Sequence, residues 1–281
     1  MSGGWGRLLR WWQRWWQRAP RAIPDPLWQA VLADYGFLQA LSPDEQQGLR
    51  ALSAEFLAQK EFHGADGLQV TDSMAIAIAA QACLPLLHLA ARPGGGTPGR
   101  GSVLRWYADF VGIVVQPGDV VARRETVDET GVVHAYDEVL AGEAMDQGPV
   151  MLSWQAVREA GDSAGAGYNV VIHEFAHKLD MADGAPDGCP PLPPGFMGAR
   201  SAAHARRQWF EIWEQAYAQF CDQVVVAERF GGELPWLDSY GSKSLDEFFA
   251  VACEAYFVNR PRFSADFPDL LPSLDAFFRS G

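Results

Sequence analysis

The segment 169–181, with the sequence NVVIHEFAHKLDM, restricts the fold more than any other part of the chain. His173 and His177 are four residues apart, so on a helix their imidazoles project from one face, about one turn apart. The residues around them, such as Phe175 and Leu179, are almost all apolar. We therefore predict a buried helix that presents two metal-binding side chains.

Residues 173–177 read HEFAH, a form of the HExxH pattern in which two histidines can hold one tetrahedral zinc ion. Glu174 lies next to the histidine face, where its carboxylate can take a proton from a water on the metal. Zinc lowers the pKa of such a water from about 15.7 to about 7, which yields a hydroxide nucleophile at neutral pH. The same residues also fit a helix with two hydrogen-bonded histidines and a surface glutamate, so a third ligand has to be found.

A third protein ligand is expected because catalytic zinc usually takes three and leaves one position open. The metzincin pattern is excluded, because the positions three and six residues after the second histidine hold Asp180 and Asp183 instead of glycine and histidine. The better candidate is Glu247, in the predicted helix 244–258. Glu254 follows seven residues later and shares its helix face. Glu247 would complete a His/His/Glu site, with Glu254 or Asp180 orienting the ligands.

These residues also have simpler explanations. Ser244 stands three residues before Glu247, and S-x-x-E is the capping-box pattern of a helix start. Glu254 would equally fit a solvated helix surface. Tyr240, in the loop before this helix, is a candidate hydrogen-bond donor to the oxyanion of a tetrahedral intermediate, or else a partly buried loop aromatic.

The rest of the chain predicts a mainly helical fold with a few strands. Two helices are expected between residues 27 and 62, and the second begins at Ser42 with Glu45 completing a capping box. Further helices are expected over 74–90, 199–230 and 244–258, followed by a short helical tail. Strand composition is found in 103–117, 132–139 and 149–154.

The first 26 residues differ from the remainder. Tryptophans and arginines alternate at helical spacing in WGRLLRWWQRWWQR, and prolines then mark a linker over 20–26. We interpret residues 1–26 as a basic N-terminal helix and linker whose tryptophans pack on the protein itself. The alternative is a helix that lies on a membrane surface or docks a partner. Residues 27–281 are predicted to form a single domain.

The charge and the cysteine content of the chain exclude several classes of protein. The formal net charge is −13 although the first 21 residues carry only basic charges, so the remainder is more acidic still. An acidic body argues against direct nucleic-acid binding, which needs a basic surface. The four cysteines form no disulfide pattern, and neither a signal peptide nor a membrane span is evident. We therefore expect a cytoplasmic protein.

Four segments together resemble a known family. They are AAQACLPLLHL (79–89), DQGPVMLSW (146–154), GYNVVIHEFAHKLDMADG (167–184) and DSYGSKSLDEFFAVACEAYF (238–257). These segments are similar to the Mlc titration factor A family of zinc peptidases, and the resemblance spans roughly residues 30–270. HExxH followed by a distant Y-x6-E-x6-E is a far more specific signature than HExxH alone.

The resemblance implies an α+β fold, a mainly helical zincin-like metallopeptidase domain with a small mixed sheet beside the HExxH helix. It implies a gluzincin site related to that of anthrax lethal factor, with one Zn²⁺ per chain bound by His173, His177 and Glu247, Glu174 as general base and Tyr240 beside the metal. It also associates His134 with the metal, implies aminopeptidase-like activity on peptides, and suggests an Mlc-like transcriptional repressor as partner. In gluzincins an edge strand beside the HExxH helix pairs with the substrate backbone, and 149–154 is the candidate.

Two other interpretations remain open. The chain would act as a protein-interaction module that titrates a transcriptional regulator, with the zinc structural or vestigial. Alternatively, it would be an aspzincin-type peptidase that uses Asp183 or Asp187 in place of Glu247.

Overall fold

The structure is a computed structural model that describes residues 20–89, 103–127 and 133–280, with only the backbone for 120–127 and 133–140. Its α-helices are α2 (Asp25–Asp34), α3 (Gly36–Gln39), α4 (Pro43–Gln59), α5 (Asp72–Cys83), α6 (Trp154–Ser163), α7 (Val170–Asp180), α8 (Ala202–Phe230), α9 (Leu245–Val258), α10 (Arg260–Asp266) and α11 (Leu271–Phe278). Its strands are β1 (Glu61–Gly64), β2 (Gly112–Gln116), β3 (Val120–Val127), β4 (Val133–Leu140), β5 (Gly142–Ala144) and β6 (Val150–Ser153). Short 3-10 helices are η1 (Leu84–Leu86), η2 (Val103–Tyr107), η3 (Ala164–Ala166), η4 (Met181–Asp183), η5 (Phe196–Gly198) and η6 (Ser239–Ser242).

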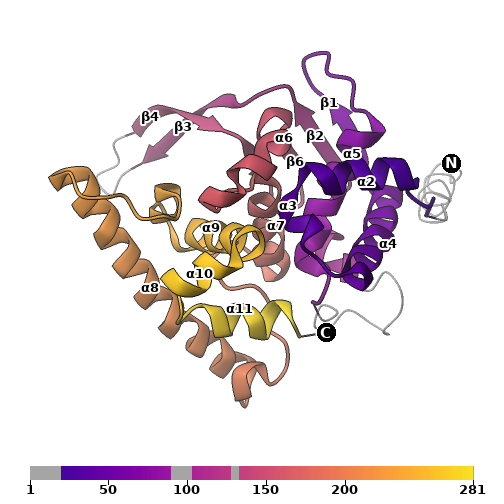
Figure 1. Ribbon diagram of the computed structural model, residues 1–281. Helices are drawn as coiled ribbons and strands as arrows, with labels where there is room; N and C mark the ends of the chain where they lie inside the picture. The colour runs from indigo at the N-terminus through magenta and orange to yellow at the C-terminus, as the bar shows by residue number, and fades with distance from the viewer. Residues whose placement is uncertain (1–19, 90–102, 128–132, 281) are drawn as a thin grey trace, which may run out of the picture.

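The α+β class is confirmed: helices dominate, and the four-stranded sheet is small and mixed. Its strand order is β1-β2-β6-β5, in which β1, β2 and β6 are parallel and β5 runs antiparallel to β6. Strands β3 and β4 form a separate antiparallel hairpin, which extends from the body at the upper left of Figure 1. The predicted strands 132–139 and 149–154 correspond to β4 and β6.

The expectation that 149–154 is the edge strand was wrong. This segment forms β6, which is hydrogen-bonded to β2 on one side and β5 on the other. The sheet edge on this side is β5, a three-residue strand without a distinct hydrophobic pattern. A strand of this length is stabilised by its neighbour rather than by its own composition, so its residues carry little sign of their conformation.

The prediction of a strand over 103–117 was only half right. The second half forms β2, but Val103–Tyr107 is the 3-10 helix η2. Its apolar residues Leu104, Trp106 and Tyr107 are buried. An apolar run with aromatic residues fits a buried strand and a buried helical turn equally well, and the tertiary contacts decided between them.

Helix ends follow the sequence signals closely. Ser42 and Glu45 make the predicted capping box at the start of α4. The predicted helix 74–90 begins slightly earlier, at Asp72, and passes into η1 at Leu84 because Pro85 has no backbone N–H to continue the α-helical pattern. The long helix α8 ends at Gly231, which adopts φ 73°.

Helix α7 lies at the centre of the molecule, between the N-terminal helices and the C-terminal helices α8–α11 (Figure 1). It packs against α9 on one side, α5 on another, and the strands β5 and β6. Phe175 points into the core, where its ring contacts those of Phe56, Tyr107 and Phe110. Because residues two apart on a helix lie on different faces, this anchoring turns His173 and His177 away from the aromatic cluster.

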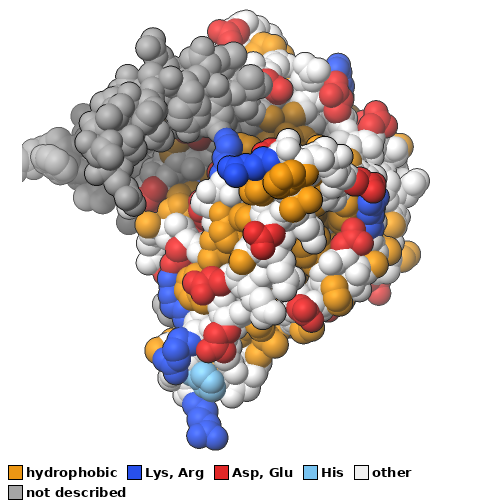
Figure 2. Space-filling view, turned by 90° about the vertical axis from the view of Figure 1, so that its left-hand side faces the viewer, with side chains coloured by type: hydrophobic (Ala, Val, Ile, Leu, Met, Phe, Trp, Pro, Cys, Tyr) orange, Lys and Arg blue, Asp and Glu red, His pale blue; other side chains and the backbone are white. Residues whose placement is uncertain are grey.

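The surface agrees with the acidic composition. Acidic side chains are scattered over the face drawn in Figure 2, between patches of apolar ones. Within the described ranges, no helix has the length and apolar character needed to cross a membrane. The predicted Trp/Arg-rich helix falls on residues 1–19, outside the described part of the chain.

Candidate metal centre

The start of α7 is fixed by Asn169. Its side-chain Oδ1 accepts a hydrogen bond from the backbone N–H of Ile172 over 2.9 Å, as expected for an N-cap residue. Its Nδ2 donates to Oε1 of Gln81 on α5 over 2.7 Å. Both side chains are fully buried. The first turn of α7, which carries His173, is therefore attached to a second helix.

Three predicted metal-ligating residues meet in one cluster. The Nε2 atoms of His173 and His177 are 3.2 Å apart, and Oε2 of Glu247 lies 3.1 Å from the first and 3.2 Å from the second. Among the described residues this is the one group of three with the composition and spacing to hold a metal ion. Glu247 lies 70 residues after His177 in the chain, and the packing of α9 on α7 brings them together.

The dimensions of the cluster fit zinc. Ligand atoms about 2.0–2.1 Å from a tetrahedral zinc ion are about 3.3 Å from one another. The triangle formed by His173, His177 and Glu247 has sides of 3.1–3.2 Å. Two imidazole nitrogens and one carboxylate oxygen are also a donor set that zinc prefers, and three protein ligands leave a fourth position open.

The capping-box alternative for Glu247 is not what the structure contains. Ser244 does stand at the N-cap of α9, but its side chain makes no capping hydrogen bond. The carboxylate of Glu247 instead faces the two histidines.

Glu254 lies directly behind His173. Its Oε1 accepts a hydrogen bond from Nδ1 of His173 over 2.8 Å, and its Oε2 accepts one from the backbone N–H of Asn169. Only 1 % of Glu254 is exposed. Because the proton of His173 is held on Nδ1, the lone pair on Nε2 is directed into the cluster.

The electrostatics of the cluster favour a cation. Burial lowers the pKa of His173, but the carboxylates of Glu254 and Glu247 outweigh this effect and raise it well above its ordinary value. Burial raises the pKa of Glu247, but the hydrogen bonds and charges of His173 and His177 more than reverse this effect. A site that holds a proton so strongly also attracts a metal ion, which would displace that proton.

Glu174 is placed to handle a proton. Glu174 is only 4 % exposed and lines the pocket beside the cluster together with His173. Burial raises the pKa of this carboxyl to about 7, while His173 and His177 act in the opposite direction. A buried carboxylate with this pKa suits a general base at neutral pH.

Gly142 allows Glu174 to occupy this position. A Cβ atom on Gly142 would lie 2.4 Å from Oε1 of Glu174. The backbone of the edge strand β5 therefore runs directly against the carboxylate, which only glycine permits. The sequence pattern did not identify Gly142, because a single glycine in a short irregular segment gives no signal of what it approaches.

A pocket of about 210 Å³ opens beside the cluster, and both His173 and Glu174 line it. Tyr240 also lines it, and its ring centroid is 5.9 Å from that of His173. The ammonium group of Lys243 lies 3.9 Å from the centroid of the Tyr240 ring. The structure thus brings the predicted Tyr240 to the same cavity as the predicted base.

Three other candidate residues do not belong to this cluster of side chains. Asp180 accepts hydrogen bonds from the backbone N–H groups of Asp187, Gly188 and Cys189, so it anchors the loop after α7 and makes no hydrogen bond to the three cluster residues. Asp187 pairs with Arg206, which gives no support to an aspzincin-type ligand set. His134 lies on β4 opposite Thr126, but its side chain is outside the described part of the structure.

Lys178 is a further residue that sequence reasoning missed. It is fully buried, and its ammonium group donates to Oδ2 of Asp109 over 2.8 Å and to the carbonyl oxygens of Met145 and Gly148. These carbonyls belong to the turn between β5 and β6. Lys178 thus attaches the edge strand to the helix that carries the cluster. A lysine inside an apolar helix was the available signal, since such a lysine needs buried partners.

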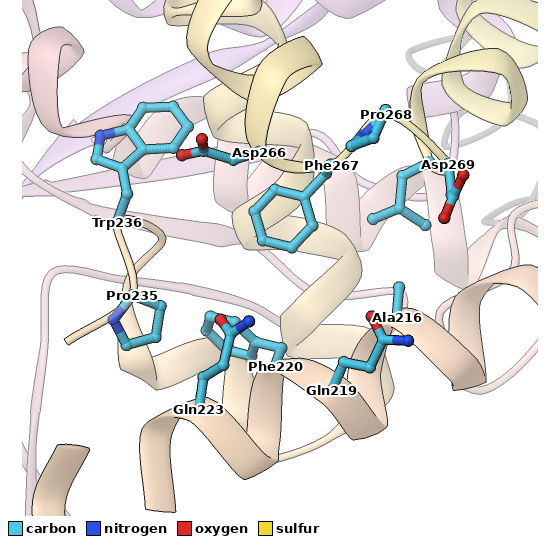
Figure 3. A pocket seen from close by; sticks show the side chains of 11 residues that line it. Ala216, Gln219, Phe220, Gln223, Pro235, Trp236, Asp266, Phe267, Pro268 and Asp269 are labelled. Carbon is cyan, nitrogen blue, oxygen red and sulfur yellow. The ribbon is translucent and has the colours of Figure 1, made fainter. Parts of the chain in front are cut away.

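A second cavity, of about 280 Å³, lies between α8 and the α10–α11 turn (Figure 3). Gln219, Phe220 and Gln223 of α8 face Phe267, and Trp236 closes one end. None of the three cluster residues lines it. It is larger than the first pocket, but its ionisable lining residues are Asp266 and Asp269, with no histidine or cysteine beside them, so we place the candidate site beside α7.

Comparison with known proteins agrees with this arrangement. The sequence profile of the glucose-regulated metallo-peptidase M90 family matches residues 9–279. An uncharacterised protein of Synechocystis is 34% identical over 257 residues, which cover 90% of this chain and 82% of that protein. Mlc titration factor A of Edwardsiella ictaluri is 33% identical over 275 residues, 97% of this chain and 93% of the relative. The corresponding protein of Pectobacterium atrosepticum is 32% identical over 254 residues, 90% and 85%. The resemblance inferred from the motifs is thereby confirmed, and the chain belongs to the glucose-regulated M90 family of metallopeptidases.

Proposed function

We propose that this protein is a zinc-dependent peptidase of the gluzincin type that hydrolyses peptide bonds with a water activated by Glu174. The observation that carries the proposal is the triangle of His173, His177 and Glu247, whose sides match those of a tetrahedral zinc site. The buried carboxylate of Glu174 stands beside it, next to Gly142. Metal ligands and an adjacent base are the parts that hydrolysis of this kind requires.

A bound zinc ion would supply Lewis-acid chemistry, polarising the substrate carbonyl and acidifying water at the open position. Glu174 takes the proton of the attacking water on its carboxylate and then delivers it to the nitrogen of the leaving amine. Glu254 keeps Nδ1 of His173 protonated throughout, so Nε2 stays available as a ligand. The phenol of Tyr240 donates a hydrogen bond to the developing oxyanion.

The substrate backbone pairs with β5. This strand is one of the two edges of the four-stranded sheet, and it lies against Glu174 at Gly142. An extended peptide added to that edge would gain main-chain hydrogen bonds and place its scissile bond beside the base. The earlier candidate for this role, β6, is paired on both sides. The resemblance to the family adds aminopeptidase-like activity to the proposal.

The test combines metal content with turnover. Purified protein should contain about one zinc per chain, and it should hydrolyse members of a chromogenic amino-acid and peptide panel until a chelator is added. Glu174→Gln should keep the zinc but lose at least about a hundredfold in kcat. His177→Ala and Glu247→Ala should lose the metal.

The matched control is Glu228→Gln, which makes the same chemical change at an exposed position on α8. It should retain both zinc and turnover. Full turnover by Glu174→Gln, or full zinc occupancy in His177→Ala and Glu247→Ala, would contradict the proposed roles.

A second function is favoured by the relatives' names. Several are called Mlc titration factor A, so we propose that this chain also binds a transcriptional repressor of the Mlc type. Binding that survives in Glu174→Gln would separate this role from peptide hydrolysis. If the wild-type protein hydrolyses nothing in the panel yet binds the repressor, the non-catalytic function stands alone.

A further inference from the structure

Glu174 and Lys178 are four residues apart on α7, so their side chains leave the same face of the helix about one turn apart. Both residues are buried. This face meets the β5–β6 hairpin, which consists of β5, a short turn and β6 (residues 142–153). Glu174 lies against Gly142 at the start of β5, and the ammonium group of Lys178 binds the turn. The base and a second contact to the hairpin thus come from one side of α7.

The ammonium group of Lys178 has an acceptor for each of its three N–H donors. These acceptors are Oδ2 of Asp109 at 2.8 Å, the carbonyl oxygen of Met145 at 2.5 Å and that of Gly148 at 3.1 Å. The side chain of Lys178 is 0 % exposed, so water cannot replace a lost partner. If the turn moved away from α7, two of the three donors of a buried charge would lose their acceptors, which is energetically costly.

The turn is strained at the place where Lys178 binds it. Gln147 adopts φ 50°, in the left-handed region that residues other than glycine rarely occupy. Lys178 donates to the carbonyls of Met145 and Gly148, one before and one after this residue. A backbone conformation of this kind persists only where the surrounding contacts hold it. Lys178 therefore supports the conformation of the turn as well as its position.

The position of the turn affects β5, because β5 has only three residues and leads directly into the turn. Among the described strands, β5 pairs only with β6. We propose that Lys178 is a positioning residue for peptide hydrolysis: it holds the turn against α7 and so sets the distance between the Glu174 carboxylate and the strand along which the substrate lies. This inference rests on the proposed function, in which Glu174 is the base and β5 pairs with the substrate backbone.

Lys60 is a matched control within the same chain. It is also buried, and the Nζ atoms of Lys60 and Lys178 lie 3.7 Å and 4.7 Å from the centroid of one ring, that of Phe110. Lys60 donates to the carbonyl oxygens of Tyr107 and Phe110, and none of its hydrogen bonds to described residues reaches the β5–β6 turn. Replacing either lysine with methionine removes a buried ammonium group from the same region, but only the change at Lys178 releases the turn.

The test compares Lys178→Met and Lys60→Met in the zinc-loaded full-length protein. It uses two substrates, an extended peptide and the shortest compound of the chromogenic panel that the wild type cleaves. In Lys178→Met we expect kcat to fall about tenfold or more for both substrates, because the base is displaced from its working position. We also expect KM to rise several-fold for the extended peptide only, since the short substrate has little backbone to pair with β5. Lys60→Met should keep both constants near those of the wild type, and both variants should keep their zinc.

A loss of stability alone would not give this result. A destabilised variant contains fewer active molecules, which lowers kcat equally for all substrates and leaves KM unchanged. If Lys178→Met does not fold, Gly148→Ala alters the same turn without a change in α7, because the new Cβ would lie 2.7 Å from Cβ of Met145. It should raise KM for the extended peptide in the same way. Where both variants fold, combining them should add little, because both act on one turn.

Hydrogen exchange measures the hairpin without any turnover. The backbone amides of residues 142–150 should exchange faster in Lys178→Met than in the wild type or in Lys60→Met. Unchanged exchange and unchanged kinetic constants in Lys178→Met would overturn the inference, as would equal changes in Lys60→Met, and either result would leave the peptidase function intact. If the wild type hydrolyses nothing in the panel, the proposed function fails, and the positioning role fails with it.

Discussion

Nδ1 of His173 donates a hydrogen bond to Oε1 of Glu254 over 2.8 Å, and this contact joins the two helices that supply the metal cluster. The same carboxylate accepts from the backbone N–H of Asn169, at the start of α7. Glu254 therefore fixes both the position of the helix and the ring orientation of one ligand. Its sequence position, two turns after Glu247, allows α9 to supply a ligand and its support from one face.

Replacing Glu254 with glutamine should weaken metal binding without abolishing it. The amide side chain keeps one oxygen acceptor but loses the charge that makes His173 a stronger ligand. We expect a loss of about 10–100-fold in zinc affinity, measured by competition with a chromogenic chelator. The control is Glu214→Gln, on the surface of α8. Unchanged affinity in Glu254→Gln would mean that this carboxylate does not support the ligand.

Replacing Gly142 with alanine should impair turnover more than metal binding. The new Cβ would lie 2.4 Å from Oε1 of Glu174, so either the carboxylate or strand β5 has to move. We expect kcat to fall about tenfold or more, because the base is displaced while the ligands are untouched. Gly36→Ala is the matched control, since a Cβ there meets nothing within 4 Å. If the two variants were equally active, turnover would not require the close approach of the Gly142 backbone to the Glu174 carboxylate.

Replacing Asp180 with alanine should destabilise the fold while leaving the metal site assembled. Its carboxylate accepts hydrogen bonds from three backbone N–H groups, at Asp187, Gly188 and Cys189, over 2.8–3.0 Å. Without it, the N–H groups of Asp187 and Gly188 lose their acceptor, while that of Cys189 keeps Oδ1 of Asp187, so we expect a cost of about 1–3 kcal/mol in the free energy of unfolding. Urea unfolding measures this, and Asp180→Asn, which keeps one acceptor oxygen, should give an intermediate value. Loss of zinc with unchanged stability would instead assign Asp180 to the metal.

Lys60 should make stability rise with pH. Burial lowers the pKa of its ammonium group to about 7, although Asp109 opposes this effect. In the unfolded chain the pKa is about 10.4. Between these two values the unfolded state binds a proton that the folded state lacks, so the free energy of unfolding increases with pH. Below about pH 7 both states are protonated, and the full cost of burying the charge lowers the stability of the folded state.

The difference between wild type and Lys60→Met isolates this contribution, since all other titrating groups are shared. We would measure the free energy of unfolding in urea at about pH 7 and about pH 10. From the lower to the higher pH, the value for the wild type should rise relative to that for the variant by up to a few kcal/mol. If this difference in the free energy of unfolding stays constant or falls with pH, the prediction is wrong. The Lys60 ammonium group would then be better solvated than its contacts with the Phe110 ring and the Tyr107 carbonyl indicate.

Much of the fold was predictable where local signals decide structure. The capping residues Ser42 and Asn169 mark helix starts that depend only on backbone donors within one turn. The edge strand β5 and the 3-10 helix η2 were not predictable, because their conformations depend on neighbours distant in the sequence. The same contrast applies to Asp180, which we predicted could orient the metal ligands and whose carboxylate accepts hydrogen bonds from the loop after α7.

The sequence alone determined the pair His173 and His177, since four residues of helix place them on one face whatever surrounds that helix. It also provided Glu247 and Glu254 on a shared face of another helix. Only the tertiary structure decided that these two faces meet, that β5 rather than β6 lies at an edge of the sheet, and that Gly142 admits the carboxylate of Glu174. The physical reason is that helical periodicity is a local property of the backbone, whereas the distance between two helix faces depends on how the whole core packs.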